Sequence, residues 1–569
     1  MTKSAVEILE KINSVINIDE VEEKRKFRDK FYESIIKFKM QIKEQEVGIV
    51  MAIPADWERN LVDVFIDDYI NFKFIPHMYS KGRVCLFDLE GVLVNINFEG
   101  LVVESVNRLE KILIEGVEDT NKLEFITEFD AYWNYQSNIG IINSLVALDE
   151  ELKKIKYTHK YKADDDRYSL LASDKEEGLR KIGKCTTIKN GIYINIKSED
   201  FIYPPDWRKV LDITYINKVL EIGKIEYQSI KNLMGNFSSE LLLLINISQP
   251  NGYNTPIAIL VKNYNYRLVK HNRLFKLNIG CKCTPLGIIR NDSEYLINRG
   301  GIFKDIKDKR VLIIGCGSIG GYLTSELVKA GVSNLCLVDE DFLSSDNIYR
   351  HLLGLEFVGQ YKTKSVIKYL ENNIPHLNLK SFEDKIENLI ENYKLDFEAF
   401  DLIISATGNH NVNRWINNYV ISDNLSVPII YLWNEVLGIG NHALFIDTKY
   451  KGCFDCLIGI DEDGLYDKTS YCKRGQVFTK KYNGCHSTFL PFGSIHSLKT
   501  VATGVELALK YFNGEIKENL LISQKGDDSY MKKEGLLTSD RYNYQNNDTW
   551  KLSGEDFVNM NCNSCYKGY

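Results

Sequence analysis

RVLIIGCGSIGGYLTSELVKAG, residues 310–331, is the stretch that decides the fold of the C-terminal half of this chain. Gly315, Gly317 and Gly320 form a G-x-G-x-x-G pattern between a short apolar strand and an amphipathic helix. Glycine lets the backbone approach phosphate, and the amino end of the helix favours phosphate charge. The stretch therefore predicts a nucleotide-binding loop. A glycine-rich turn without a ligand is the alternative, and the motif alone does not separate NAD from ATP.

Charged side chains follow the next expected strand, LCLVD, at the sheet edge where such folds bind their ligands. Asp339 and Asp341 stand at the end of that strand, and carboxylates there suit ribose hydroxyls. Arg350 and Lys362 follow, and their positive charges suit a triphosphate and its transition state. A dehydrogenase has little use for those cations, so we expect ATP.

The length of 569 residues predicts about three domains. Residues 1–148 combine a helical pattern over about the first 40 residues, short β-rich runs and a helical segment at 102–116, and predict an α+β domain. Residues 149–292 carry further strand runs and predict an α/β domain whose role the sequence does not reveal. In residues 293–569 buried apolar strands alternate with helices, which predicts a mostly parallel, doubly wound sheet.

Composition narrows the class of partner. The chain is 44% hydrophobic and 26% charged, with a formal net charge of −7, which disfavours nucleic acid as a partner. No stretch approaches the roughly 20 apolar residues of a membrane span, and the N-terminus does not have the pattern of a signal peptide. We therefore expect a cytoplasmic protein. In that reducing compartment the 12 cysteines suit metal ligands, nucleophiles or core residues better than disulfides.

The segment after the glycine loop resembles the adenylation domain of ubiquitin-activating enzymes and of the bacterial sulfur-carrier activators MoeB and ThiF. The shared pattern is the loop, then D-x-D, N-x-x-R and G-x-x-K. The resemblance implies that Asp341 binds ribose, that Asn347 and Arg350 lie on the phosphate side, and that Lys362 binds phosphate. It also matches Arg299, in LINRGG, to an arginine that reaches the partner subunit's active site, which implies a homodimer.

One position departs from the family pattern. After the strand DLIISAT the family usually has an aspartate in T-D-N that helps to hold Mg²⁺, whereas this chain has Gly408 in T-G-N. Either Asn409, Asp339 or Asp341 takes over the magnesium, or adenylation is weakened. We favour compensation, because Arg350 and Lys362 are retained.

Two C-x-x-C pairs suit a structural zinc site. They are Cys453 with Cys456 and Cys562 with Cys565. Four thiolates close the tetrahedral shell of Zn²⁺, and each pair spans one tight turn. Two unrelated pairs are the alternative. The adenylating family carries a structural zinc in this region, so the resemblance implies a zinc that holds the C-terminal tail to the core.

Cys485, in NGCHSTFLPFGS, lies where activating enzymes place the cysteine that accepts the activated carboxyl group. Lys480, Lys481 and His486 are its neighbours, and positive charge lowers the pKa of a thiol. Cys472, in SYCKRG, is the rival. A small buried hydrophobic residue is the alternative for either cysteine. We prefer Cys485.

Cys85, in PHMYSKGRVCLFDLEG, resembles the active-site cysteine of ubiquitin-conjugating enzymes. The usual H-P-N tripeptide is missing, and PHM with His77 stands in its place, so the asparagine that stabilises the oxyanion must be absent or supplied from elsewhere. Asp88 and Glu90 are carboxylates close to Cys85 that could assist an incoming amine. A buried strand residue is the alternative reading of Cys85.

Together the two halves resemble the fusion enzymes of bacterial antiphage CBASS operons. That resemblance implies activation of a protein's C-terminal carboxylate, thioesters on Cys485 and then Cys85, and transfer to an amine. The protein substrate would be a cGAS-like nucleotidyltransferase. Two alternatives remain. The first is a sulfur-carrier adenylyltransferase in which the N-terminal domain only recruits a partner and Cys85 receives no acyl group. The second is a scaffold that binds ATP without turning it over.

Overall fold

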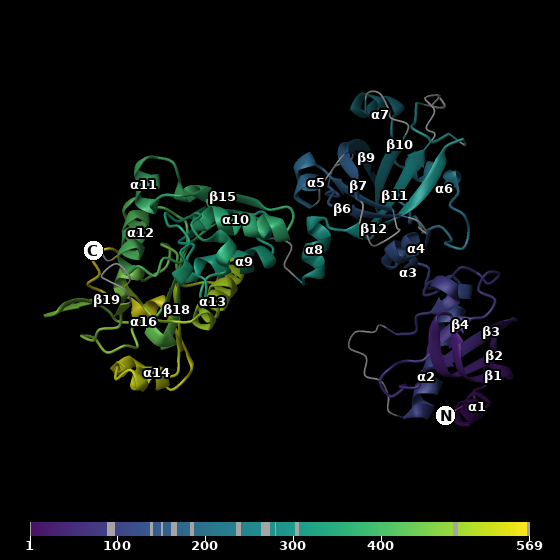
Figure 1. Cartoon of the computed structure of the whole chain (residues 1–569), viewed down its shortest axis with the longest axis horizontal. Coiled ribbons are helices and arrows are strands. Elements are labelled where there is room, and N and C mark those ends of the chain that lie inside the picture. Colours follow the sequence, from purple (N-terminus) through teal and green to yellow (C-terminus); the bar gives the residue numbers. More distant parts are fainter. Residues whose placement is uncertain are drawn as a thin grey trace. The chain divides into compact units, whose positions relative to one another are not determined.

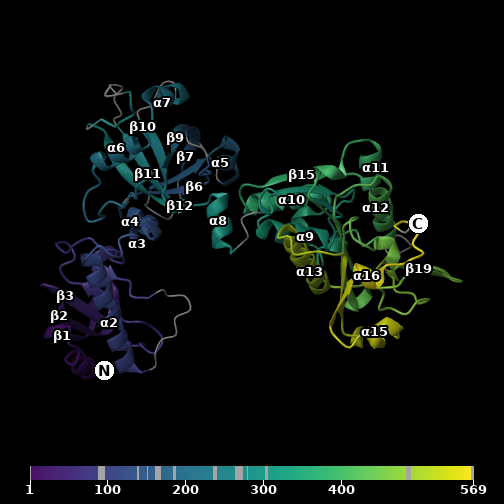
Figure 2. The same ribbon diagram turned by 180° about the vertical axis from the view of Figure 1, so that it is seen from behind.

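The structure is a computed structural model of the chain (Figures 1 and 2). It describes all residues except 1, 88–96, 137–139, 150–151, 161–167, 183–186, 235–239, 263–272, 279, 302–305, 482–487 and 566–569. The chain divides into two compact units, residues 1–292 and residues 293–569. Each unit has its own sheets and its own apolar cores.

The first part of unit 1 is a five-stranded antiparallel sheet with two helices packed on it. Its strands, in spatial order, are β1 (Val15–Phe27), β2 (Lys30–Ile42), β3 (Gln45–Ile53), β4 (Asp63–Ile66) and β5 (Arg83–Val84). The helices α1 (Thr2–Leu9) and α2 (Phe98–Val117) share one apolar core with a face of β2 and β3. The helical segment expected at 102–116 is therefore confirmed within α2.

The expectation of helix over about the first 40 residues is wrong after α1. β1 and β2 form a hairpin whose turn residues, Arg28 and Asp29, have positive φ angles. β1 is an edge strand, and none of its residues is fully buried. A charged edge strand lacks the alternation of buried and exposed residues that marks a strand in sequence, so its Glu- and Lys-rich composition favoured a helix.

The second part of unit 1 is a closed barrel of seven strands. The strands, in spatial order, are β10 (Glu240–Ser248), β11 (Asn254–Lys262), β12 (Lys282–Arg290), β6 (Gly140–Ser144), β8 (Tyr168–Ser173), β7 (Leu152–Lys160) and β9 (Ile188–Lys197). Parallel pairs, such as β6 with β12, mix with antiparallel pairs, such as β10 with β11. Closure depends on pairing between strands far apart in the chain, which local patterns do not reveal.

Short helices pack against the barrel strands. They are α4 (Phe129–Gln136), α5 (Glu176–Ile182), α6 (Ile213–Ile222) and α7 (Tyr227–Met234), and α3 (Glu124–Thr127) comes directly before α4. The mixture of helix and strand agrees with the coarse expectation for residues 149–292, but the barrel itself was not predicted. β6 comes before residue 149, so the barrel draws one strand from the region assigned to the first domain.

Unit 2 is built on one eight-stranded sheet. Its strands, in spatial order, are β15 (Asn378–Phe382), β14 (Asn334–Val338), β13 (Arg310–Ile314), β16 (Leu402–Ser405), β17 (Ile429–Asn434), β18 (Gly440–Ile446), β23 (Leu520–Lys525) and β24 (Thr549–Ser553). The first five strands are parallel, as the alternation of strands and helices predicted. The last three run antiparallel and were not predicted.

Helices cover both faces of this sheet. α9 (Gly320–Lys329), α10 (Lys362–Asn373) and α13 (Ser494–Phe512) bury their apolar residues on one face, and α9 and α13 lie side by side (Figures 1 and 2). α11 (Ile386–Glu391) and α12 (His410–Ser422) cover the other face. The chain leaves β13 toward β14 and β15 and returns to β16 on the other side, so the carboxyl end of β13 is the point where such sheets bind ligands.

The remaining elements of unit 2 are short. They are α8 (Ser293–Arg299), α14 (Ser529–Lys533), α15 (Asp540–Tyr544), α16 (Gly554–Phe557) and the strands β19 (Ile458–Asp461), β20 (Gly464–Asp467), β21 (Lys480–Lys481) and β22 (Thr488–Phe489). Among the described residues, no helix combines the length and the apolar character needed to cross a membrane.

Candidate functional site

A cavity of about 590 Å³ opens at the carboxyl ends of the parallel strands of unit 2. It is lined by the glycine loop after β13, the segment after β14, the loop after β15 and the turn after β16. The sequence-predicted residues that the structure brings together in its lining are Gly315, Gly317, Asp339, Asp341, Asn347, Arg350 and Lys362. Residues from four separate segments therefore face one space of nucleotide size.

Glycine occupies the three loop positions for different structural reasons. Gly315 has φ +91°, and a Cβ there would lie 3.0 Å from the backbone of Ala406. A Cβ on Gly320 would lie 1.8 Å from the carbonyl oxygen of Gly315, which leaves no room for a side chain. Gly317 has no neighbouring atom within 4 Å of that position and lines the cavity. The first and last glycine thus permit the turn, and Gly317 leaves space on its open side.

Asp339 joins the glycine loop to the segment after β14 through its two oxygens. Oδ2 accepts a hydrogen bond of 2.6 Å from the backbone N–H of Cys316, and Oδ1 accepts one of 2.8 Å from Asp341 N–H. Asp341 in turn accepts from Lys362, with Nζ 2.6 Å from Oδ2. Asp339 is therefore a support for the loop, and Asp341 with Lys362 presents a charged pair to the cavity.

Arg350 connects the cavity to the segment that follows Cys485. Its Nη1 donates to the carbonyl of Leu490 at 3.4 Å, and its guanidinium lies over the ring of Phe492 at 5.2 Å. Asn347 accepts at Oδ1 from the hydroxyl and the backbone N–H of Ser344, which shapes the turn before it. Arg350 can therefore bind a phosphate in the cavity while it contacts the chain near residue 490.

His351 is a cavity residue to which the sequence assigned no role. Its Nε2 donates to the carbonyl of Cys316 at 2.7 Å, and its Nδ1 accepts from Leu353 N–H at 3.0 Å. Burial lowers the pKa of His351, which agrees with a neutral ring that donates at one nitrogen and accepts at the other. The ring and Asp339 thus both bind the backbone of Cys316 in the glycine loop.

The turn after β16 is open at the position of the family aspartate. Gly408 has φ +64°, and nothing lies within 4 Å of the position of a Cβ. Asn409 caps α12, because its Oδ1 accepts from the backbone N–H groups of Asn411 and Val412. Three further carboxylates also line the cavity, and the sequence reasoning missed them: Glu340, Asp384 and Glu387. Asp384 and Glu387 follow β15, and the carboxyl end of a parallel strand was the signal that could have found them.

Arg299 is exposed at the end of α8 and is absent from the cavity lining. The role that the resemblance gives it requires a second subunit, so the arrangement within one chain leaves that expectation untested.

The two C-x-x-C pairs come together in unit 2. The Sγ atoms of Cys453, Cys456, Cys562 and Cys565 lie within 4.8 Å of one another. The first three residues are buried and Cys565 is exposed. Asn417 supports the first pair, since its Oδ1 accepts from Phe454 N–H at 3.0 Å and its Nδ2 lies 3.7 Å from Cys453 Sγ. Four soft ligands this close together fit a tetrahedral Zn²⁺.

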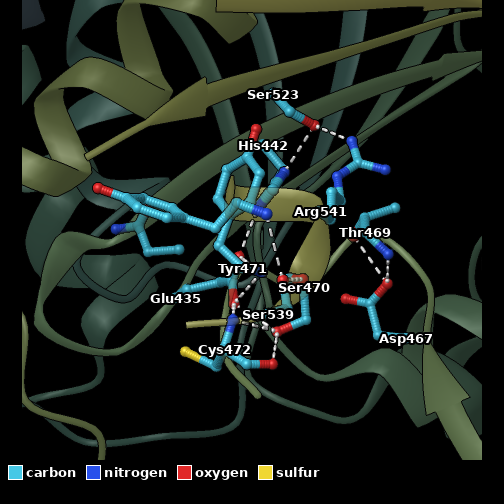
Figure 3. Close-up of polar contacts among 12 residues, drawn as sticks. Glu435, His442, Asp467, Thr469, Ser470, Tyr471, Cys472, Ser523, Ser539 and Arg541 are labelled. Carbon is cyan, nitrogen blue, oxygen red and sulfur yellow. Dashed lines mark hydrogen bonds and ion pairs between the residues drawn. The ribbon is translucent and has the colours of Figure 1, made fainter. Parts of the chain in front are cut away.

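Cys472 belongs to a buried polar network around Glu435 (Figure 3). Glu435 accepts from the backbone N–H groups of Tyr471 at 2.7 Å and Cys472 at 3.2 Å, and pairs with Nε2 of His442 at 2.9 Å. Burial and the Glu435 carboxylate raise the pKa of the Cys472 thiol well above its ordinary value. This environment makes Cys472 a poor nucleophile. Cys485 and His486 lie outside the described residues.

Cys85 lines a second cavity, of about 430 Å³, in unit 1. Its backbone N–H donates to the carbonyl of His77 at 3.0 Å, and its Sγ donates to the carbonyl of Phe87 at 3.4 Å. The residue is half-buried and lines the cavity, and its part in acyl transfer stays a prediction. Asp88 and Glu90 lie outside the described residues.

His77 is not among the residues that line the Cys85 cavity. Its Nε2 pairs with Glu124 at 2.8 Å and its Nδ1 with Glu128 at 2.8 Å. Burial opposes the charge of the ring, but the two carboxylates outweigh burial and raise the pKa of His77 to about 9. His77 therefore joins its loop to the segment before α4, and both ring nitrogens are engaged away from the thiol.

Two family models match the chain. The model of the ThiF family matches residues 294–508, and the model of prokaryotic E2 family B matches residues 15–141. The first range holds the glycine loop and its cavity, and the second holds Cys85.

Curated relatives extend this similarity. The ATP-dependent ubiquitin transferase-like protein Cap2 of Pseudomonas aeruginosa (strain BWHPSA011 / Pa011) is 28% identical over 244 residues, which cover 41% of this chain and 42% of that protein. Cap2 of Escherichia coli (strain TW11681) is 23% identical over 530 residues, which cover 83% of this chain and 86% of that protein. The match thus spans less than half of the first relative and most of the second.

Among solved structures, E. coli MccB with ATP is 18% identical, with a TM-score of 0.33, over 48% of this chain and 68% of MccB. The two family models and the E. coli Cap2 match, which extends over most of the chain, agree on its two-part composition. The chain is a fusion of an E2-like domain with a ThiF/MoeB-like domain.

Proposed function

We propose that this chain uses ATP to activate the C-terminal carboxylate of a protein and conjugates that protein to an amine. The observation that carries the proposal is the single cavity into which the glycine loop, Asp341, Arg350 and Lys362 converge. Its lining offers ribose and phosphate ligands at the end of β13. The names of the curated relatives, which are ATP-dependent ubiquitin transferase-like proteins, support the same reaction class.

The first step joins the carboxylate to the nucleotide. An oxygen of the protein's terminal carboxylate attacks the α-phosphorus of ATP, and pyrophosphate leaves. Lys362 and Arg350 counter the negative charge that develops on the phosphate oxygens, while Asp339 and His351 hold the loop that receives the phosphates. Asp341 binds the ribose.

Magnesium fits the same cavity. Carboxylate oxygens are the ligands that Mg²⁺ prefers, and four such side chains line the cavity around Asp339: Glu340, Asp341, Asp384 and Glu387. Bound Mg²⁺ would neutralise charge on the phosphates. These carboxylates support the view that the chain compensates for Gly408.

Two thiols complete the proposed reaction. The Cys485 thiolate attacks the carbonyl of the acyl-adenylate and AMP leaves, and Cys85 then attacks that thioester and Cys485 leaves as a thiolate. An amine of the acceptor, such as a lysine, finally attacks and releases Cys85. The buried environment of Cys472 supports Cys485 as the first thiol.

The partners are proposals that rest on the family resemblance. The activated protein would be a cGAS-like nucleotidyltransferase in cytoplasmic antiphage defence, and Arg299 would serve the active site of a second copy in a homodimer. Residues 1–148 would act as the conjugating domain, 149–292 as a linking domain and 293–569 as the activating domain. Zinc bound by the four clustered cysteines would hold the C-terminal segment to the sheet.

The test combines two measurements on the full chain. ATP–pyrophosphate exchange, with a cGAS-like nucleotidyltransferase from the same gene neighbourhood, reports adenylation. Intact mass without reductant then compares wild type with Cys85→Ala, Cys485→Ala and Cys472→Ser. We expect an adduct on Cys85 that requires Cys485 and survives Cys472→Ser. Exchange without any thioester would favour a sulfur-carrier adenylyltransferase.

A scaffold that binds ATP is the second candidate, and Gly408 is the observation that favours it. The absence of pyrophosphate exchange in the presence of tight ATP binding would support the scaffold and contradict the proposal.

A further inference from the structure

Among the described residues that line the Cys85 cavity there is no asparagine, so we looked for another side chain of that lining that can donate to the oxyanion formed when a thioester carbonyl is attacked. The hydroxyl and cationic donors that line it are Arg28, Lys30, Tyr32, Tyr79, Ser80, Lys81, Arg83 and Tyr135. A hydroxyl or a cation can donate to an oxyanion only if its hydrogen is available in the cavity. The partners of each group therefore narrow the choice among them.

Most of the charged donors are already paired. Asp63, 7% exposed, accepts from Tyr32 at 2.7 Å and pairs with Lys30 at 3.1 Å and Arg83 at 2.7 Å. Lys81 pairs with Asp29. These contacts use the one hydroxyl hydrogen of Tyr32 and hold the cations of Lys30, Arg83 and Lys81 against carboxylates.

Tyr135 differs from these groups. Its side chain is 36% exposed, and within the described residues its hydroxyl has no hydrogen-bond partner. Tyr79, which also lines the cavity, directs its hydroxyl to Glu128. Burial raises the pKa of Tyr135, the nearby Arg83 lowers it, and Cys85, which lines the same cavity, is a smaller raising influence.

The ring of Tyr135 is held in place from two sides. Its centroid lies 6.0 Å from the ring of Tyr79 and 5.9 Å from that of Trp207. Trp207 comes from the barrel part of unit 1, and its Nε1 donates to the carbonyl of Met78 at 3.4 Å. A donor that is fixed before the reaction loses little freedom when the oxyanion forms.

The barrel also anchors the helix that carries Tyr135. On α4, Trp133 Nε1 donates to the carbonyl of Leu286 at 3.0 Å, and Asn134 Oδ1 accepts from Ile288 N–H at 2.8 Å. Both partners lie in the barrel strand β12. The barrel therefore sets the position of Tyr135 relative to the sheet that carries Cys85.

We propose that the Tyr135 hydroxyl donates the oxyanion hydrogen bond at Cys85, in the role that asparagine has in other conjugating enzymes. The inference rests on the proposed function, since it concerns the acyl transfer to and from Cys85. In that step the Cys85 thiolate forms a C–S bond to the incoming carbonyl carbon. The carbonyl oxygen becomes negative, accepts from Tyr135, and reforms its double bond as the donor thiolate leaves.

Arg28 is the strongest rival within the same cavity. Its Nη1 is buried without a hydrogen-bond partner in the described part of the chain. However, its guanidinium packs among three aromatic rings, at 4.9 Å from Phe27, 4.8 Å from Phe65 and 5.3 Å from Tyr69. That packing accounts for the side chain as a structural contact. The experiment below separates the two residues.

The test measures two reactions of Cys85 in the full chain carrying Cys485→Ala. The first is acylation by a small probe, the hippuryl thioester of 2-mercaptoethanesulfonate, followed by intact mass with peptide mapping. The second is alkylation by iodoacetamide, which attacks a saturated carbon and forms no oxyanion. We expect Tyr135→Phe to slow acylation of Cys85 about 10- to 100-fold and to leave alkylation within about twofold.

Controls distinguish the possible failures. Tyr203→Phe removes a hydroxyl outside the cavity in the same unit and should change neither rate. If wild-type Cys85 is acylated no faster than free cysteine, the proposed function itself fails at this thiol. If wild type is acylated and Tyr135→Phe matches it, or if Arg28→Gln alone slows acylation, the inference about Tyr135 is overturned. Equal slowing of both reactions would also overturn it, because the hydroxyl would then act on the thiol.

Discussion

Lys362 Nζ lies 2.6 Å from Asp341 Oδ2, and the lysine side chain is 11% exposed where the aspartate is 63% exposed. The ammonium is thus held in place at the wall of the cavity before any nucleotide binds, and the solvated carboxylate is the partner that can turn to a ribose. A buried cation that is already oriented stabilises developing phosphate charge without first having to be ordered.

Replacement of Lys362 by methionine should therefore lower the rate of ATP–pyrophosphate exchange by about 10²- to 10³-fold. Lys364→Met is the matched control, because Lys364 lies on the same helix but pairs with Glu383 at 3.0 Å and does not line the cavity. Exchange with that variant should stay within about twofold of wild type. A similar fall in both variants would contradict the role of Lys362.

The open turn at Gly408 predicts the effect of restoring the family aspartate. Aspartate and asparagine adopt positive φ more readily than most residues, and nothing lies within 4 Å of the new Cβ, so both variants should fold. Gly408→Asp should lower the Mg²⁺ concentration for half-maximal pyrophosphate exchange several-fold, whereas the uncharged Gly408→Asn should not. Equal behaviour of the two variants would place the magnesium away from residue 408.

The cysteine cluster predicts one Zn²⁺ per chain, measurable by elemental mass spectrometry. Cys456→Ala should abolish that zinc and lower the melting temperature of unit 2 by roughly 5 to 10 °C, because the metal joins the C-terminal segment to the sheet. Cys281→Ala, a cysteine outside the cluster, should retain full zinc content. A chain that carries no zinc yet melts like wild type would contradict the structural role.

Local patterns predicted unit 2 well because its signals are local. The glycine loop, the parallel strands β13, β14, β16 and β17 and the charged residues after β14 all follow from short runs of sequence, whereas the polar strand β15 does not. Parallel strands end at one edge, which places Asp341 there, whereas Lys362, the first residue of α10, was assigned to the same site by the family pattern. The carboxylates Asp384 and Glu387 obey the same rule but stand outside the family pattern, and so were missed.

Unit 1 was predicted less well because its features depend on distant contacts. The charged edge strand β1 has no alternation to reveal it, and the barrel closes through pairs such as β6 with β12, which are separated by more than a hundred residues. The lining of the Cys85 cavity comes from four stretches of the chain. Tyr135 lies on α4 and is held by Trp207 of the barrel, so its position could not be inferred from the sequence around Cys85.

The raised pKa of His77 predicts a pH dependence of stability in unit 1. Its folded pKa, about 9, exceeds the unfolded value of about 6.5, so its ion pairs contribute fully below about pH 6.5 and are lost as pH rises through about 9. Urea unfolding should show that His77→Gln destabilises the unit by roughly 1 to 2 kcal/mol at pH 6, allowing for solvent screening, and by much less at pH 9.5. Lys73→Gln, which removes the exposed pair with Asp119, should have a small effect that does not change between these pH values. A constant effect of His77→Gln across the range would mean that the ring stabilises its loop by packing rather than by charge.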